Sequence, residues 1–367
     1  MNTKYQWRNW LAMALTLGAV LAAHAVRADE PSLKVGDPAP KLQSGKYLQG
    51  DPIEGFANGK AYIVEFWATW CGPCRVSIPH LNEIYLKFKD KGLIVLGQDC
   101  WEHDDKLVAP FVKNMGDKMT YRVALDDKSG DETGKMAAAW MQAAGQDGIP
   151  TAFLVDTKGN LAWIGHPMEL KDSVIEDVLA GKYDLSKAGK EFEESKKQEK
   201  LLAEASEAIQ KAVDAKQWDE AMTKVGELEK LMPEEDRPGA NMMRFNILLQ
   251  KEDYPAAYKL AAQVSEASKN DPELLNGIAW EIATNDKIKD RNLALAEKMA
   301  MRANEASKGK DPNVLDTLAR VQFMNGKTDA AVQTEQKAVD VSSGDDKTAL
   351  QKFLKSYQDG KLPKLDE

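Results

Sequence analysis

Apolar and polar positions follow two different patterns along the chain, and the change falls near residue 184. In the first half, apolar runs of strand length are separated by stretches with helical periodicity. The predicted strands are 61–67, 92–97, 120–125, 151–156 and 160–165, and the predicted helices are 72–89, 104–115, 131–143 and 170–180. Alternating strands and helices predict an α/β domain with a central mixed sheet flanked by helices.

The second half shows helical periodicity throughout. Small residues recur there at similar intervals, at Ala221, Ala257, Ala296 and Ala331, which are 36, 39 and 35 residues apart. Seven positions after each, on the same helical face, stand Leu228, Val264, Ala303 and Ala338. This period predicts an all-α domain of helical hairpins similar to tetratricopeptide repeats, two of them clear and two degenerate. Such an array either binds a protein or peptide partner on its concave side, or only packs against the first domain or a second copy.

The first 28 residues have the pattern of an export signal. Lys4 and Arg8 precede an apolar stretch over 11–23, and small residues follow before Asp29. We therefore expect a signal peptide that is cleaved near Ala28, and a protein located in the periplasm or cell envelope. An uncleaved membrane tether is the alternative, although about 13 apolar residues fall short of the roughly 20 that a spanning helix needs.

The net charge and the number of cysteines exclude some classes of function. The chain of 367 residues has a formal net charge of −9, which argues against a nucleic-acid partner. It contains 3 cysteines, too few for a framework of structural disulfides. Since an exported protein meets an oxidising compartment, its thiols are expected to serve chemistry rather than structure.

Two of the thiols form a Cys-Gly-Pro-Cys motif at 71–74, directly after the predicted strand 61–67. If the strand is followed directly by a helix, Cys71 lies at the helix N-terminus, where free N–H groups and the helix dipole favour a thiolate. Cys74 then lies one turn further, within bridging distance. The pattern predicts a redox dithiol in which Cys71 attacks and Cys74 resolves. Half of a zinc site is the alternative, but no second Cys pair exists, and His80 and His103 lack the spacing of a zinc finger, so we expect no metal and no cofactor.

Two segments, Glu65-Phe-Trp-Ala-Thr-Trp-Cys-Gly-Pro-Cys74 and Gly148-Ile-Pro-Thr-Ala-Phe-Leu-Val-Asp156, resemble the thioredoxin superfamily. The opening Val35-Gly-Asp-Pro-Ala-Pro40 is similar to its redoxin, or TlpA/ResA-like exported, branch. The resemblance covers about residues 33–183. It implies a thiol–disulfide oxidoreductase that exchanges disulfides with envelope proteins and with an electron-donor or acceptor redox protein.

The resemblance also implies roles for single residues. Pro150 would be cis and would face the two sulfurs, and the backbone of Ile149 would pair with substrate. Gly72 and Pro73 are expected to bind substrate, and Trp70 is interpreted as a residue that shields the site, with contact to substrate as the alternative. Gly72-Pro73 matches thioredoxin itself, which suggests a reductant or isomerase.

Glu65 stands six residues before Cys71, where thioredoxins have a buried acid. Burial would raise its pKa and allow it to take and return the proton of Cys74. Alternatively, its carboxylate reaches water at the sheet edge. Cys100 is interpreted as a small buried hydrophobic residue, with an extra redox thiol as the alternative.

The predicted organisation is a signal peptide at 1–28, a thioredoxin-like domain at 29–183, a charged helical linker at 184–200, helical repeats at 201–343, and a C-terminal helix and tail at 344–367. Two other functions stay open. One is a peptide- or protein-binding adaptor with a redox-sensing head. The other is a thiol peroxidase, which is disfavoured because Ala68 stands where peroxiredoxins have Thr or Ser.

Overall fold

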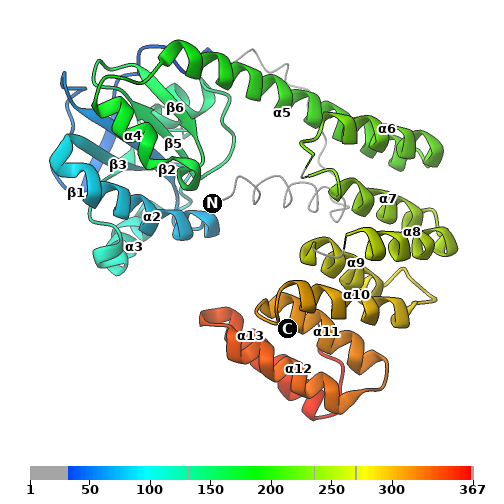
Figure 1. Cartoon of the computed structure of the whole chain (residues 1–367). Coiled ribbons are helices and arrows are strands. Elements are labelled where there is room, and N and C mark those ends of the chain that lie inside the picture. The colour runs from blue at the N-terminus through cyan, green and yellow to red at the C-terminus, as the bar shows by residue number, and fades with distance from the viewer. Residues whose placement is uncertain (1–31, 131, 235, 269–270, 365–367) are drawn as a thin grey trace. The chain divides into compact units, whose positions relative to one another are not determined.

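The computed structural model describes residues 32–130, 132–234, 236–268 and 271–364 (Figure 1). The signal peptide predicted at 1–28 lies outside these residues. The chain divides into two compact units between residues 198 and 199. Within the described ranges, no helix combines the length and the apolar character needed to cross a membrane.

The first unit is built on one six-stranded sheet with the order β1-β4-β3-β2-β5-β6. Its strands are β1 (Ser44–Gln49), β2 (Ala61–Trp67), β3 (Leu93–Asp99), β4 (Arg122–Asp126), β5 (Thr151–Val155) and β6 (Leu161–Gly165). The pairs β2–β3 and β3–β4 are parallel, whereas β1–β4, β2–β5 and β5–β6 are antiparallel. The mixed sheet predicted from the sequence is therefore confirmed.

Helices cover this sheet (Figure 1). The α-helices of the first unit are α2 (Gly72–Phe88), α3 (Val108–Met115) and α4 (Asp172–Leu179), and the first part of α5 (Leu185–Asp214) also belongs to it. The shorter helical segments are the 3-10 helices Lys89–Lys91, Asp105–Leu107, Gly116–Lys118 and Pro167–Glu169, and a π-helix at Ala137–Gln142. The predicted helices 104–115 and 131–143 are thus only partly regular α-helix.

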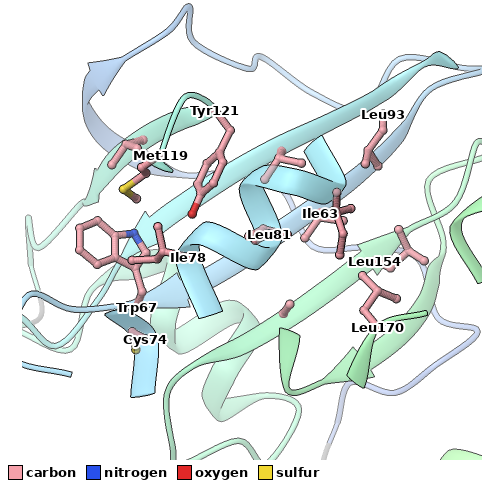
Figure 2. Close-up of a cluster of buried hydrophobic side chains, with 14 of the residues drawn as sticks. Ile63, Trp67, Cys74, Ile78, Leu81, Leu93, Met119, Tyr121, Leu154 and Leu170 are labelled. Atoms are coloured by element: carbon pink, nitrogen blue, oxygen red, sulfur yellow. The ribbon is translucent and has the colours of Figure 1, made fainter. Parts of the chain in front are cut away.

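Strand β2 is buried along its whole length because it lies between two hydrophobic clusters. Ile63 and Trp67 pack with α2 residues in one cluster (Figure 2). Tyr62, Val64 and Phe66 belong to the other cluster. Successive side chains of a strand point to opposite faces, so one apolar run supplies both cores. This burial fixes the end of β2, where the Cys-Gly-Pro-Cys segment begins.

Strand β1 has no counterpart among the strands that the sequence predicts. Its sequence, Ser-Gly-Lys-Tyr-Leu-Gln, contains only two large apolar residues and no alternation. It lies at the edge of the sheet, and its pairing with β4 has two register shifts. An edge strand that is only partly buried carries little of the hydrophobic pattern by which strands are recognised.

The second unit consists of helices over its described residues. After α5 they are α6 (Trp218–Leu231), α7 (Gly239–Gln250), α8 (Tyr254–Ala267), α9 (Pro272–Thr284), α10 (Leu293–Ala306), α11 (Pro312–Met324), α12 (Thr328–Val341) and α13 (Gly344–Gln358). The four recurring alanines are each the fourth residue of a helix, namely α6, α8, α10 and α12. All four, and the four residues seven positions later, are buried. The spacing found in the sequence therefore marks equivalent positions of four helices.

The turns before three of these helices are also equivalent. Lys216, Glu252 and Gly326 have left-handed backbone conformations, and each stands two residues before the start of α6, α8 or α12. The turn before α10 is longer, because it runs from the end of α9 at Thr284 to Leu293, and it lacks a residue in this conformation. The same helical hairpin thus recurs, and one of its copies has a longer turn.

Candidate active site

The two cysteines of the motif lie where β2 passes into α2. Cys71 is the N-cap of α2, and its Sγ accepts the backbone N–H of Cys74 at 3.1 Å. The two cysteines form a disulfide with their Cα atoms 5.3 Å apart. Pro73 stands in the first turn, where a missing N–H costs no helical hydrogen bond. In the dithiol form, the same N–H and the helix dipole stabilise a thiolate at Cys71.

Exposure differs between the residues of the motif. Trp70, Gly72 and Pro73 are exposed, whereas the side chain of Cys74 is completely buried and Cys71 is 3% exposed. A partner molecule therefore meets the Cys71 side of the disulfide first. Both cysteines belong to the hydrophobic cluster that contains Trp67 and Ile78, and Cys74 is the more deeply buried of the two (Figure 2).

The Ile149–Pro150 segment lies against Cys71. The bond between the two residues is cis, and the carbonyl oxygen of Ile149 lies 3.7 Å from Cys71 Sγ. The cis bond implied by the resemblance is confirmed, and the contact between Ile149 and Cys71 agrees with the implied position of this segment beside the motif. The ladder between β2 and β5 ends at the pair Phe66–Thr151, so Ile149 lies just beyond its last pair.

Glu65 is fully buried on β2, between neighbouring strands β3 and β5. The hydroxyl of Tyr121 donates to Glu65 Oε2 at 3.1 Å, and the hydroxyl of Ser77 donates to Oε1 at 3.3 Å. Burial raises the pKa of Glu65 to about 8, and the two hydrogen bonds oppose that rise. The predicted buried acid with a raised pKa is confirmed, and the alternative of a carboxylate that reaches water is wrong.

Glycine is required opposite Glu65, at Gly97 of β3. A Cβ there would stand 2.9 Å from Tyr121 Cε2 and 3.1 Å from Trp67 Nε1. Both rings are fully buried and cannot move aside freely. We expect Gly97→Ala to lower the free energy of unfolding of the first unit by about 1–3 kcal/mol, measured by urea denaturation. Gly55→Ala is the control, because no atom lies within 4 Å of its added Cβ. Equal stability of Gly97→Ala and wild type would contradict the crowding.

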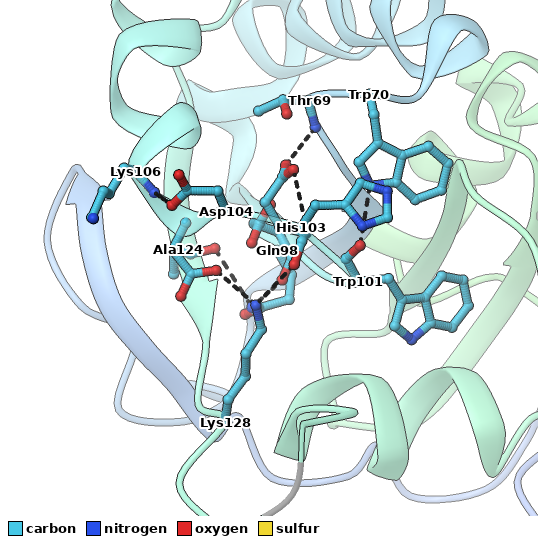
Figure 3. Close-up of polar contacts among 12 residues, drawn as sticks. Thr69, Trp70, Gln98, Trp101, His103, Asp104, Lys106, Ala124 and Lys128 are labelled. Atoms are coloured by element: carbon cyan, nitrogen blue, oxygen red, sulfur yellow. Dashed lines mark hydrogen bonds and ion pairs between the residues drawn. The ribbon is translucent and has the colours of Figure 1, made fainter.

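The loop Cys100–His103, from which the sequence analysis considered only Cys100 as a redox residue, lies beside the motif (Figure 3). The Glu102 carboxylate accepts the backbone N–H groups of Thr69 at 2.7 Å and of His103 at 3.2 Å. Trp70 Nε1 donates to the carbonyl of Trp101 at 3.1 Å, and the rings of Trp70 and His103 lie 5.5 Å apart. The loop therefore fixes Trp70, which keeps 48% of its surface exposed. The loop follows the carboxyl end of β3, which is parallel and adjacent to β2, and this position is the one feature of the sequence that places the loop beside the motif.

Two further buried groups lie at the carboxyl end of β3, Asp99 as its last residue and Cys100 directly after it. Burial raises the pKa of Asp99 to about 8, and neither of its carboxylate oxygens has a hydrogen-bond partner within the described part of the chain. Cys100 is a free, buried thiol whose pKa burial raises well above the usual range. A thiol that stays protonated is a poor nucleophile, which favours the interpretation of Cys100 as a small buried residue. Over the same described ranges, no group of three or more His, Cys, Asp or Glu side chains is placed to hold a metal ion.

Comparisons with known proteins find relatives of the first unit. The family described as Redoxin matches residues 34–179. Protein FixW of Rhizobium leguminosarum is 29% identical over 165 residues, which is 42% of this chain and 70% of FixW. The thiol-disulfide oxidoreductase ResA of Bacillus thuringiensis is 33% identical over 135 residues, 36% of this chain and 70% of ResA. A solved structure of a thiol:disulfide interchange protein from Chlorobium tepidum is 30% identical and covers 39% of this chain and 96% of that one, with a TM-score of 0.32.

Proposed function

This chain belongs to the redoxin family of thioredoxin-like thiol-disulfide oxidoreductases, and on that premise we propose that Cys71 is the attacking thiol and Cys74 the resolving thiol. In the reducing direction, the Cys71 thiolate attacks one sulfur of a substrate disulfide and releases the other as a thiolate. Cys74 then attacks Cys71 Sγ and releases the second substrate thiolate. Two electrons pass to the substrate, and the Cys71–Cys74 disulfide remains.

The order of the two thiols is supported by their positions. Cys71 is the N-cap residue and adjoins the exposed Gly72 and Pro73, whereas Cys74 is completely buried. A buried thiol does not ionise readily, so its attack needs a base nearby. Glu65 is the buried acid on the adjoining strand, and we assign to it the proton of Cys74.

The substrate is a polypeptide that carries the reacting cysteine. Its extended backbone would pair with Ile149, next to Pro150, because this segment continues the line of β5 beyond the last pair of the ladder and lies against Cys71. Trp70 would form one wall, since it is exposed on one side and fixed by the Cys100–His103 loop on the other. Gly72 and Pro73 complete the surface around the sulfur.

The remaining parts of the chain have roles that fit this activity. Residues 1–28 act as a signal peptide, so that the enzyme works on envelope proteins that contain disulfides or thiols, together with a redox protein that donates or accepts electrons. The helical repeats of the second unit, similar to tetratricopeptide repeats, bind a protein partner. The equivalent buried positions in α6, α8, α10 and α12 support the repeat assignment.

The direction of electron flow is tested by the reduction potential of the Cys71–Cys74 pair. The protein would be equilibrated in glutathione and dithiothreitol buffers, and the thiol content measured by alkylation and mass spectrometry. Because the motif has the Gly-Pro pair of thioredoxin, we expect a value near −270 mV, which describes a reductant. A value near −120 mV would contradict the reducing direction, and a pair that does not cycle would contradict the enzyme itself.

A further inference from the structure

The Glu65 carboxyl is held by two side chains that no part of the motif identifies. We propose that Ser77 and Tyr121 are positioning residues of the exchange reaction, whose hydroxyl groups fix the Glu65 carboxyl in one orientation and set the pH at which it accepts the proton of Cys74. This inference rests on the role proposed for Glu65. It assigns to two further residues a part in the resolving step.

The two hydroxyls reach the carboxyl from different elements. Tyr121, just before β4, donates to Oε2 at 3.1 Å, and Ser77, in α2, donates to Oε1 at 3.3 Å. Each carboxyl oxygen therefore has one donor, and rotation of the carboxyl would break both hydrogen bonds. Both donors are completely or almost completely buried, so water does not replace them when they are lost.

Ser77 also links Glu65 to the resolving cysteine. It stands three residues after Cys74, which is about one helical turn, and its Oγ also donates to the Cys74 carbonyl oxygen at 3.2 Å, so its single proton is shared between this carbonyl and Glu65 Oε1. The same hydroxyl thus contacts the acid and the turn of α2 that carries the thiol. This arrangement fixes the acid relative to the start of α2.

Few other groups act on Glu65. Its register partners are Gly97 on β3 and Ala152 on β5, and neither titrates. The elements packed against β2 carry further titratable groups, namely Arg75, His80, Glu83, Tyr85 and Lys87 in α2 and Asp99 in β3. Of these groups and Tyr121, Tyr121 alone contributes to the pKa shift of Glu65. Burial raises the pKa of Glu65, whereas a hydrogen bond donated to the carboxylate lowers it. Loss of either hydroxyl therefore shifts the ionisation of Glu65 to higher pH.

The resolving step can be measured alone in the full-length protein. Reduced enzyme is mixed with the disulfide of nitrothiobenzoate. Cys71 attacks and releases one coloured thiolate, and Cys74 then attacks Cys71 Sγ and releases the second, while its proton passes to Glu65. The rate of the second release is recorded from pH 6 to 10 for wild type, Tyr121→Phe and Ser77→Ala. The Cys74→Ser variant gives the rate of the first thiolate release alone, because it has no thiol to cause the second release.

Controls separate this inference from the role of Glu65. Tyr85→Phe removes the hydroxyl of a neighbouring ring that packs edge-on against Tyr121 at 6.2 Å, and Ser77→Thr keeps a hydroxyl at position 77. Glu65→Gln tests the acid itself. In each variant the carbonyl band of protonated Glu65, identified in infrared spectra by its absence in Glu65→Gln, reports the ionisation of the acid directly.

We expect Tyr121→Phe and Ser77→Ala each to move the midpoint of the pH profile and of the carbonyl band upward and to slow the second release at pH 7 by about three- to tenfold. Tyr85→Phe and Ser77→Thr should stay close to wild type. Unchanged midpoints in both hydroxyl variants, with a slow Glu65→Gln, would overturn the positioning role and leave the acid in place. A second release at the wild-type rate in Glu65→Gln would instead overturn the role of Glu65, and with it this inference.

Discussion

Cys71→Ser lowers the rate of disulfide exchange to the uncatalysed background, a loss of at least about a thousandfold. The reason is that serine at neutral pH offers no anion at the helix N-terminus, whereas the N-cap position and the N–H of Cys74 stabilise a thiolate in the wild type. The rate would be measured as reduction of a protein disulfide by the full-length enzyme. Cys74 cannot replace the missing thiol, because it is completely buried behind Cys71.

Cys74→Ser is the matched variant and has a different expected result. The first attack stays within a few fold of wild type, but the mixed disulfide on Cys71 accumulates, since no thiol remains to release it. Equal loss of the first attack in both variants would contradict the assigned order. The double variant Cys71→Ser, Cys74→Ser tests the adaptor function, because an adaptor would bind its partners unchanged without any thiol.

The central strand and the chemistry at its end could be predicted from the sequence because both depend on local patterns. The apolar run 61–67 coincides with β2, and the helix that follows starts at Gly72 as predicted. The Cys-Gly-Pro-Cys motif and the Ile149–Pro150 segment are 75 residues apart or more in the chain, and only the resemblance brought them together. In the structure, one contact of 3.7 Å joins them.

The parts that were missed depend on contacts between distant residues. Glu102 gives no sign in the sequence that its carboxylate binds the backbone of Thr69, because an acidic residue in a loop is usually solvated. Tyr121 and Ser77 likewise stand in ordinary strand and helix patterns, and their common contact with Glu65 arises only when α2 packs on the sheet. Patterns of single elements predict which faces are buried, but not which polar groups meet between them.

The stability of the first unit should fall as pH rises from about 4.5 to about 8, and Glu65→Gln should remove a large share of that fall. Glu65 has its pKa raised from 4.5 to about 8 in the folded protein. Between these values the folded state binds a proton that the unfolded state has released, so rising pH favours unfolding. A difference of this size corresponds to roughly 4–5 kcal/mol, which is a large part of the stability of an ordinary domain.

The measurement is hydrogen exchange of β2 and β5 amides by mass spectrometry, corrected for intrinsic rates and made on the oxidised protein at pH 5, 6.5 and 8. Because β2 and β5 belong to the first unit, their exchange reports the stability of that unit. Asp99, whose pKa burial also raises to about 8, contributes in the same direction, so Asp99→Asn removes a second and separate share. Glu54→Gln, an exposed acid, should keep the full slope. An equally steep loss of stability with pH in the Glu65→Gln protein and in wild type would contradict this prediction. Glu65 would then be ionised in the folded state at neutral pH. An ionised Glu65 has no proton to return to Cys74 when the disulfide is reduced.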